Sequence, residues 1–302
     1  MIHGGCTRND ELDLPPCPRD MVGCGLSDLW RFDPDSGGWC QPGPVLSPDG
    51  SPYVARGHGI VNDADERLIF FGGMRYDSNL KPETLDLVFS FVPDTRQSRK
   101  IAVLPEGLSA FAYCYDRTNQ VVYLHGGLDS TFKAKSSLWK IHLLSGEISL
   151  LSSTGPARFS HALALFEDSL WLLDGCSGVP VNQADFPPGL WRFSLAEGLW
   201  TQTDFQSPHR HPRYGAAYAI KGPCLYSFGG FFPAERTDNG HMGLSFDELW
   251  RLNLASLTGS KLNQQSIPAR EMATMNFLGD ELVLFGGYSH GTFFCDTHSL
   301  VL

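Results

Sequence analysis

The sequence predicts an all-β protein built from repeated four-stranded units. Two short sequence words carry this prediction. The first places an aromatic residue in an apolar run after a polar or glycine start, as in "SDLWRF", "SSLWKI", "GLWRF" and "DELWRL". The second is an apolar run that stops at two glycines, as in "LIFFGG", "VVYLHGG", "LYSFGG" and "LVLFGG". Words that recur along one chain indicate one structural unit used several times, rather than several separate sites.

The glycine pairs give the period of the repeat. A short "IHGG" at the N-terminus and a variant "LWLLDGC" extend the set, whose first glycines are Gly4, Gly72, Gly126, Gly175, Gly229 and Gly286. Successive members lie 49 to 68 residues apart. Apolar runs of four or five residues bounded by turn residues are typical of buried strands and too short for helices. We therefore expect six repeats, at residues 1–45, 46–101, 102–153, 154–204, 205–265 and 266–302.

The third repeat shows how one unit divides into four strands. "FAYCY" leads through a turn at residues 116–120 into "VVYLHGG", the strand that ends at the glycine pair. After a loop, "SLWKIHL" leads through a turn at Ser145–Gly146 into "EISLL". Glycine, aspartate, asparagine and serine occur at these turns because tight reversals favour them. "DELWRLNL" is then a third strand, and we expect its Trp250 to pack between neighbouring sheets rather than to contact a ligand.

These features resemble the kelch repeat over nearly the whole chain. A double glycine follows an apolar strand, and a Trp precedes a second aromatic residue by nine positions, as in Trp30 and Trp39 or Trp191 and Trp200. Kelch repeats, of the galactose oxidase central-domain-like superfamily, form β-propellers with one four-stranded blade per repeat. The resemblance implies a single six-bladed propeller with incomplete seam blades. Its innermost strands should be the small-residue runs "HALAL" and "GAAYA", because crowding is greatest near the axis.

Two positions depart from the kelch pattern. Phe89 stands in the second repeat where the first, third, fourth and fifth repeats carry Trp, and Cys176 stands where the fourth repeat should have its second glycine. Positive φ costs a residue with a Cβ roughly 1–2 kcal/mol. We therefore expect Cys176 to keep a negative φ and the following loop to leave at a different angle.

The ends of the chain also depart from a closed ring. The first repeat starts at a stub of its second strand, and the last repeat stops at its third strand. The absent strands belong to different blades, so neither terminus supplies what the other lacks. The sequence therefore predicts a truncated product lacking roughly 20 to 30 residues at ordinary strand lengths. The alternative is a ring that tolerates two three-stranded blades at its seam.

Composition narrows the class of protein and its partners. Apolar residues make up 42% of the chain and charged residues 19%, which is typical of a globular protein. The formal net charge of -10 disfavours a general nucleic-acid surface, and no apolar run is long enough to cross a bilayer. Eight cysteines without a CxxC pair are typical of reduced thiols in a cytoplasmic protein. A zinc or disulfide cluster remains the alternative for Cys6, Cys17, Cys24 and Cys40.

The variable loops predict one recognition face. The interval from the glycine pair to the third-strand aromatic residue ranges from 13 to 26 residues, whereas the interval back to the next pair stays between 36 and 42. Second-to-third-strand loops and inter-blade links emerge on the same face of an antiparallel blade. The links repeat a basic residue as the first strand begins, at Arg56, Arg158, Arg213 and Arg270. We expect these four to ring the channel mouth and bind carboxylates of a partner; the alternative is structural pairing with backbone carbonyls or acids.

A second constellation could hold a divalent transition metal. Imidazole and carboxylate groups occur in two segments of the fifth repeat, at His209, His211, Glu235, Asp238 and His241. Both segments should open on the recognition face. The alternative is a polar surface loop, since nothing in the spacing requires these side chains to converge.

Two functions follow from the resemblance. We expect a protein-protein interaction module that works as a scaffold or adaptor, without a cofactor, as a monomer, with a partner that presents an acidic peptide segment. The alternative is a propeller enzyme of the galactose oxidase or sialic-acid mutarotase type, with or without a metal. Galactose oxidase holds copper with two His and two Tyr, one of which is linked to a Cys. The candidates for that linked pair, Tyr113 and Cys114, lie inside a repeat. Kelch motifs indicate fold more specifically than function.

Overall fold

The computed structural model describes residues 2–3, 6–7, 24–25, 27–33, 36–65, 67–179, 181, 185–206, 210–236, 242–263, 266–300 and 302. Every element assigned within these ranges is a β-strand. The described residues include no helix with the length and hydropathy of a membrane span. The chain divides into an N-terminal lobe (Met1–Phe111 and Tyr115–Leu150) and a C-terminal lobe (Ala112–Cys114 and Leu151–Leu302).

Two four-stranded antiparallel sheets, blades A and B, belong mainly to the N-terminal lobe. Blade A consists of β6 (Gly59–Asn62), β7 (Leu68–Phe71), β10 (Leu87–Val92) and β11 (Gln97–Val103). A short hairpin, β8 (Met74–Tyr76) and β9 (Pro82–Thr84), stands between its second and third strands. Blade B consists of β12 (Ala112–Asp116), β13 (Val121–His125), β14 (Leu138–His142) and β15 (Ile148–Ser152).

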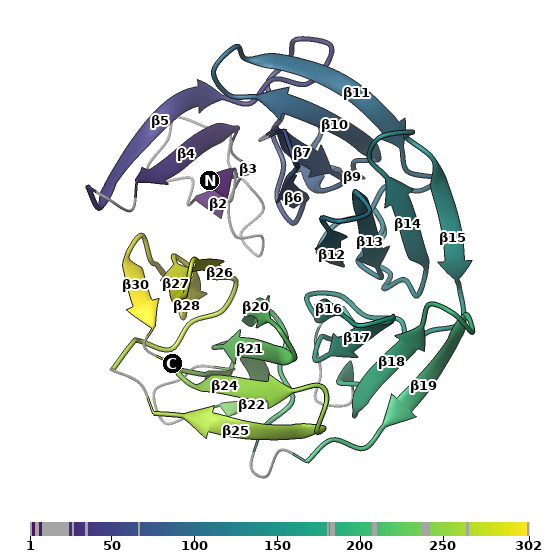
Figure 1. Ribbon diagram of the computed structural model, residues 1–302. Helices are drawn as coiled ribbons and strands as arrows, with labels where there is room; N and C mark the ends of the chain where they lie inside the picture. Colours follow the sequence, from purple (N-terminus) through teal and green to yellow (C-terminus); the bar gives the residue numbers. More distant parts are fainter. Residues whose placement is uncertain are drawn as a thin grey trace. The chain divides into compact units, whose positions relative to one another are not determined.

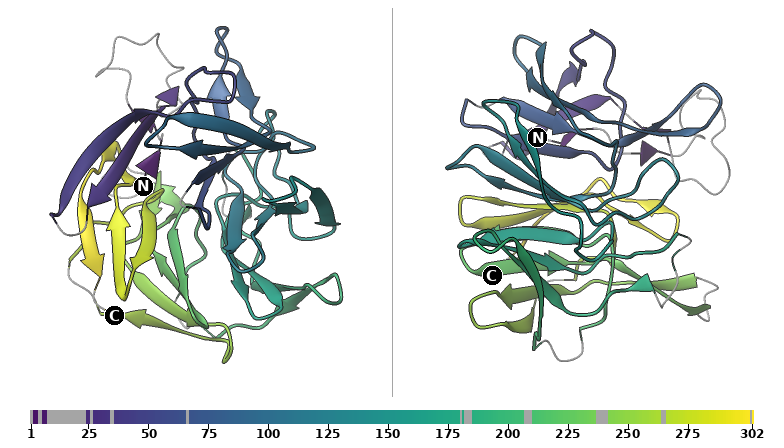
Figure 2. Two further views of the ribbon diagram at one scale, coloured as in Figure 1. Left: turned by 45° about the horizontal axis from the view of Figure 1, so that its top comes forward. Right: turned by 90° about the vertical axis from the view of Figure 1, so that its right-hand side faces the viewer.

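The C-terminal lobe contains blades C, D and E. Blade C consists of β16 (Ala162–Phe166), β17 (Ser169–Leu173), β18 (Leu190–Ser194) and β19 (Leu199–Thr203). Blade D consists of β20 (Ala217–Lys221), β21 (Cys224–Phe228), β24 (Leu249–Asn253) and β25 (Thr258–Leu262), with the hairpin β22 (Phe231–Arg236) and β23 (Met242–Ser245) between β21 and β24. Blade E consists of β26 (Thr274–Leu278), β27 (Glu281–Phe285) and β30 (Thr297–Leu300), with the hairpin β28 (Tyr288–Ser289) and β29 (Thr292–Phe293). In each blade the strands lie side by side in the sheet order, as Figures 1 and 2 show.

The prediction of four-stranded antiparallel blades is confirmed for blades A to D, and blade E has three strands. The count of six blades is wrong, because the structure shows five. The N-terminal sheet consists of the hairpin β4 (Asp28–Asp33) and β5 (Gly38–Pro44) with the two-residue β1 (Ile2–His3) beside β4. A separate two-residue pair joins β2 (Cys6–Thr7) to β3 (Cys24–Gly25). The prediction of six repeats counts "IHGG" as the second strand of the first repeat. A pairing of two residues has too few ladder hydrogen bonds to make this sheet a blade.

Trp250 packs between neighbouring sheets, as predicted, but the corresponding aromatic residues of the other repeats are not all buried. Trp250 is 3% exposed and packs in a cluster with Ala164 and Trp171 of blade C and Leu225 of blade D. Trp30, by contrast, is 38% exposed. The apolar period therefore identifies the third strand, whereas the neighbouring sheet decides how deeply its aromatic residue is buried.

Phe89, which stands in place of the usual Trp, packs against other aromatic rings in blade A. The Phe89 ring stacks on Phe70 with centroids 5.3 Å apart and meets Tyr53 edge-on at 4.9 Å. Both phenylalanines are fully buried, in a cluster that also contains Leu29 of the N-terminal hairpin. Phenylalanine thus fills this position without an indole N–H that would need a hydrogen-bond partner.

The glycine pair of the fourth repeat lies one position earlier than the sequence pattern suggests. Asp174 and Gly175 have φ values of 63° and 85°, matching 70° and 93° at Gly229 and Gly230. Cys176 follows them and pairs across to Phe159. It is absent from the residues with positive φ, as expected. The reason for that expectation was wrong, because Asp174, not Cys176, replaces a glycine of the pair.

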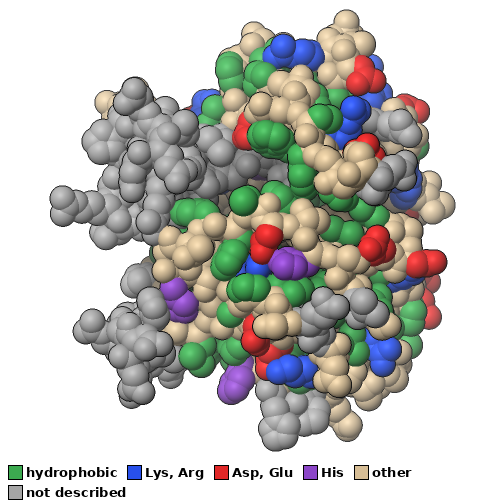
Figure 3. Space-filling view, turned by 90° about the vertical axis from the view of Figure 1, so that its left-hand side faces the viewer, with side chains coloured by type: hydrophobic (Ala, Val, Ile, Leu, Met, Phe, Trp, Pro, Cys, Tyr) green, Lys and Arg blue, Asp and Glu red, His purple; other side chains and the backbone are tan. Residues whose placement is uncertain are grey.

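Charged side chains of both signs share the face drawn in Figure 3. Among the described residues drawn on that face, lysine and arginine side chains are scattered together with aspartate and glutamate between apolar and neutral groups. Phosphate-backbone binding relies on clustered basic side chains. The described residues on this face show no such clustering.

Candidate functional site

Two matching loops extend from the N-terminal lobe. "DSNLK" (residues 77–81) joins β8 to β9 in blade A, and "DSTFK" (residues 129–133) occupies the corresponding place in blade B. We call these the tip loops. Their shared sequence, aspartate, serine, a polar residue, an apolar residue and lysine, was not singled out by the sequence analysis. A search for repeated words within the loops, rather than the strands, would have found it.

The aspartate at the start of each tip loop determines the loop's conformation. One oxygen of Asp77 accepts the backbone N–H groups of Asn79 and Lys81, both at 2.8 Å. These hydrogen bonds, the one from Lys81 first, hold the pKa of Asp77 below its usual range. Because side-chain-to-backbone bonds of this kind stabilise a turn, the loop is held in one shape. Leu80 completes the reversal with a φ of 59°.

Blade B repeats this geometry. Asp129 accepts the backbone N–H groups of Thr131 at 2.9 Å and Lys133 at 3.1 Å, and Phe132 has a φ of 61°. Burial alone would raise the pKa of Asp129, but hydrogen bonds from Thr131 and Lys133 lower it. Lys135 adds ion pairs to Asp129 at 3.4 Å and to Glu106 at 3.0 Å.

Each tip loop presents an apolar residue beside a lysine. Leu80 is 40% exposed and Phe132 is partly exposed, and the neighbouring Lys81 and Lys133 are both exposed. Positive φ is uncommon for residues with a Cβ and occurs most often where function or a turn requires it. The loops therefore hold an apolar group and a positive charge in the same relative positions on two blades.

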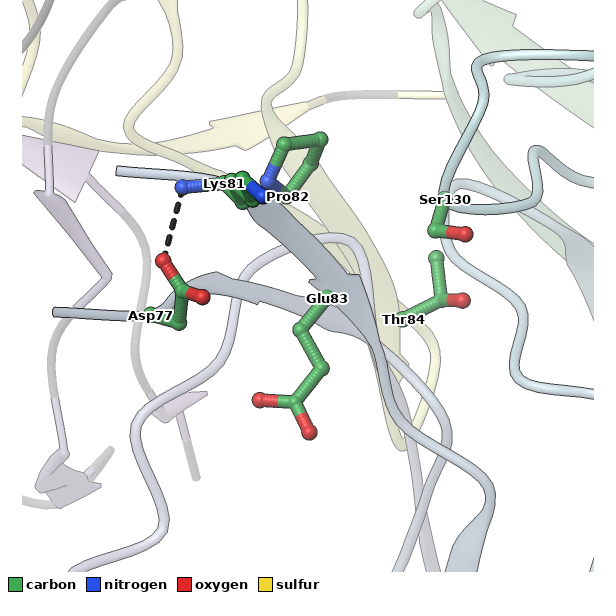
Figure 4. Close-up of a pocket in the computed structure, with 6 residues that line it drawn as sticks. All are labelled: Asp77, Lys81, Pro82, Glu83, Thr84 and Ser130. Carbon is green, nitrogen blue, oxygen red and sulfur yellow. Dashed lines mark hydrogen bonds between the residues drawn. The ribbon is translucent and has the colours of Figure 1, made fainter. Parts of the chain in front are cut away.

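A shallow pocket of about 450 Å³ lies against these loops. Its walls are Asp77, Lys81, Pro82, Glu83 and Thr84 from the first tip loop and β9, and Ser130 from the second tip loop. Figure 4 shows Thr84 and Ser130 next to each other on one side and Asp77 with Lys81 on the other. The pocket lining thus offers hydroxyl groups, a lysine and carboxylates.

Arg56 lies at the base of the first tip loop. Its Nη2 donates a hydrogen bond to the hydroxyl of Tyr76 at 2.7 Å, and its guanidinium rests over that ring, 5.2 Å from the centroid. The carbonyl of Gly72 accepts a hydrogen bond from the hydroxyl of Tyr53. Arg56 stays partly exposed.

Arg213, in the link into blade D, is fully buried and its donors are occupied within its own lobe. Nη1 donates to the carbonyl of Gly229 at 2.9 Å, Nε to the carbonyl of His211 at 3.2 Å and Nη2 to Glu248 at 3.0 Å. Its guanidinium lies 4.2 Å from the ring centroid of Phe246.

Arg270 repeats the arrangement in blade E. Nη1 donates to the carbonyl of Gly286 at 2.9 Å, and Nε donates to Pro268 at 3.1 Å. Two further bonds, of 2.5 and 3.0 Å, join the guanidinium to Asp296, and Phe294 lies 4.1 Å below it. Hydrogen bonding from Arg270 lowers the pKa of Asp296 to about 2. Both arginines therefore have structural partners in their own blades.

Arg158, in the link into blade C, differs from both. Its Nη1 donates to the carbonyl of Asp174 at 2.6 Å, which corresponds to the carbonyls of Gly229 and Gly286. Its Nε and Nη2 are buried without a hydrogen-bond partner among the described residues. Because burial penalises the charged form, the pKa of Arg158 falls to about 10.

Asp174 also binds a second buried arginine, Arg210, and the sequence analysis predicted neither residue as part of a site. Its carboxylate accepts two bonds from Arg210, of 2.7 and 2.5 Å, and one from the hydroxyl of Tyr218 at 2.9 Å. Arg210 also donates to Ser227 at 3.2 Å. Alignment on the length of the apolar strand, rather than on the glycine letters, would have placed Asp174 at a glycine position.

Comparison with known proteins decides the family. A sequence model of the KLHDC2/KLHL20/DRC7 Kelch-repeats domain matches residues 57–287. The chain belongs to the kelch-repeat family. It is also similar to tip elongation aberrant protein 1 of Schizosaccharomyces pombe, with 24% identity over 204 residues, or 64% of this chain. That match covers 17% of the relative's length.

The kelch chain's predicted metal constellation lies mostly outside the described residues. His209, Asp238 and His241 fall in undescribed stretches, and Glu235 is described in its backbone alone. His211 stacks on Phe246, with centroids 5.9 Å apart and planes 9° from parallel. Among the described residues there is no group of three or more His, Cys, Asp and Glu side chains able to hold a metal ion. The metal site stays a prediction.

The predicted cysteine cluster is described only in part. Cys40 is exposed and forms no disulfide. The backbones of Cys6 and Cys24 belong to the paired strands β2 and β3, and Cys17 lies outside the described residues. The alternative of a zinc or disulfide cluster therefore stays open.

Glu271 is a buried carboxyl in the kelch core that the sequence pattern did not single out. It follows Arg270 and is 9% exposed, where the corresponding residues after Arg158 and Arg213 are Phe159 and Tyr214. Its Oε2 has no hydrogen-bond partner among the described residues. Burial raises the pKa of Glu271 to about 7.

Proposed function

We propose that this kelch domain binds a partner protein through the two tip loops and the link that carries Arg56. Kelch-repeat propellers act in general as protein-interaction modules. The observation that carries the finer proposal is the twin loop, in which Leu80 with Lys81 and Phe132 with Lys133 stand in matching conformations.

The geometry favours a partner segment that is both acidic and apolar. Lysine side chains attract carboxylates, and the adjacent apolar residues gain from burial at an interface. Because side-chain-to-backbone hydrogen bonds order the loops beforehand, binding loses less conformational entropy than it would with flexible loops. Arg56, which is partly exposed beside Tyr76, adds a third positive charge to the proposed face.

Of the four arginines predicted to bind the partner, Arg56 alone is partly exposed, whereas Arg158, Arg213 and Arg270 are fully buried. We therefore include Arg56 in the proposed face. Partner binding by the three buried arginines stays a prediction. Arg213 and Arg270 can support a face only indirectly, since their donors already have partners.

Selection from a displayed peptide library on the immobilised protein tests the proposal. The wild type should enrich peptides that combine Asp or Glu with Leu or Phe. K81E/K133E should lower their affinity by roughly tenfold or more, because two attractive charges become repulsive. R99E/K100E is the matched control, since it makes the same charge change at exposed positions on β11. Equal losses in both variants, or enrichment of basic peptides, would contradict the proposal.

A further inference from the structure

Arg158 presents an unoccupied hydrogen-bonding edge in the interior of the C-terminal lobe. The side chain is 0% exposed, and Nε and Nη2 have no partner among the described residues. These two nitrogens form one side of the planar guanidinium, whose parallel N–H groups match the two oxygens of a planar oxyanion. Burying such donors without a partner costs free energy.

The corresponding edge is occupied in blades D and E. In blade D, Nη2 of Arg213 binds Glu248, two positions before Trp250. In blade E, Arg270 binds Asp296, two positions before His298. In both blades, a carboxylate two residues before the ring-bearing residue of the third strand accepts hydrogen bonds from the arginine of the same blade.

Blade C has no carboxylate at that position. Gly189 stands two residues before Trp191, and Pro187 stands where Phe246 lies in blade D. Gly189 has a φ of 83°, and a Cβ there would lie 2.6 Å from Nε2 of Gln202. A side chain at position 189 would therefore need a strained backbone and a shift of Gln202, and Gly189 supplies no carboxylate to Arg158.

The charged groups around Arg158 include more buried guanidinium groups than carboxylates. Arg158 and Arg210 both contact Asp174, which supplies one carboxylate for two buried guanidinium groups. Nε of Arg210 is a third buried N–H without a partner among the described residues. Tyr218 stays neutral, because burial raises its pKa well above the usual value. The nearby Arg213 is already matched by Glu248.

We propose that the open edge of Arg158 binds a small planar oxyanion, of the size of formate, bicarbonate or nitrate, as an internal ligand of the C-terminal lobe. Two N–H groups of Arg158 hold its oxygens, and its charge offsets the excess positive charge beside Asp174. Complete burial of Arg158 favours a free anion of few atoms over a carboxylate on a partner's side chain. This site is independent of the tip loops, which belong to the other lobe.

Thermal unfolding of the full chain in sodium formate and in sodium fluoride at equal concentration tests the site. A ligand that binds only the folded state raises its stability by mass action. The wild type should unfold about 2–4 °C higher in saturating formate than in fluoride, as for roughly 1 kcal/mol in a chain of this size. R158M should lose this difference. R192M, the same charge change at an exposed position of β18, should retain it.

Direct binding covers the case in which R158M fails to fold. R158K keeps the charge without the two-pronged edge, and it should also lose the formate effect. Carbon-13 formate should show line broadening with the wild type that excess nitrate reverses. An equal formate shift in R158K or R158M, or no broadening with the folded wild type, would overturn the proposal. Stabilisation by a tetra-aspartate peptide through Arg158 would overturn the free-anion version in favour of a partner carboxylate.

Discussion

The fully buried Arg213 and the partly buried Glu248 form an ion pair, with 3.0 Å between Nη2 and Oε2. Arg213 lies in the link between blades C and D, and Glu248 precedes β24, so the pair ties the link to the third strand of blade D. Partial burial alone would raise the pKa of Glu248, but hydrogen bonds from Trp250, Arg213 and Lys261 lower it to about 2.

Glu248→Ala should lower the free energy of unfolding by about 3 kcal/mol, because it leaves the guanidinium of Arg213 buried without its counter-charge. Urea unfolding followed by tryptophan fluorescence measures the change. D280N is the control: Asp280 pairs with Lys221 at an exposed turn, and such pairs contribute about 0–1 kcal/mol. A loss at Glu248 no larger than that at Asp280 would show that the buried pair is not stabilising.

Glu271 should make stability fall as pH rises between about 4.5 and 7. Burial raises the pKa of this carboxyl to about 7, so in that window the folded state binds a proton that the unfolded state has lost. Ionisation in the core then costs up to about 3 kcal/mol. E271Q should flatten this part of the stability profile and be more stable than the wild type at pH 8. Urea unfolding at several pH values measures it, and parallel profiles for both proteins would refute the role of Glu271.

Asp174→Gly separates backbone strain from ion pairing. Glycine relieves the positive φ of 63°, a gain of about 1 kcal/mol. It also leaves Arg210 buried without its carboxylate, which costs about 3–5 kcal/mol. The net effect should be destabilisation by several kcal/mol. Asp174→Asn, which keeps the shape and removes the charge, should lose nearly as much; a stabilised D174G protein would show that strain outweighs the ion pair.

Gly230→Ala and Gly222→Ala form a matched pair for the blade glycines. Gly230 has a φ of 93°, and a Cβ would lie 3.1 Å from the carbonyl of Tyr214 and from the Cβ of Ala216. Gly222, with a φ of 56°, has open space around it. G222A should cost about 1 kcal/mol of backbone strain, and G230A distinctly more because the neighbouring backbone must also move. Equal melting temperatures for the two variants would contradict the close approach inferred at Gly230.

The repeat could be predicted from sequence because its signals are local. Positive φ at Gly72 and Gly73 and strand alternation around them depend on neighbouring residues in the chain. The count of blades could not, because "IHGG" becomes part of a blade only if it pairs extensively with a partner strand, and β1 pairs over two residues. Strand pairing is non-local, so a matching word does not ensure it.

The sequence by itself determined the all-β class, the four-stranded repeat and the places of Arg158, Arg213 and Arg270 at the start of their blades. Only the tertiary structure decided which of these arginines has a carboxylate partner. The acid that binds Arg213 lies 35 residues along the chain at Glu248, and the corresponding residue for Arg158 is Gly189. Such pairing depends on how separate segments pack in three dimensions, because a buried charge is stabilised by whatever group the fold places beside it.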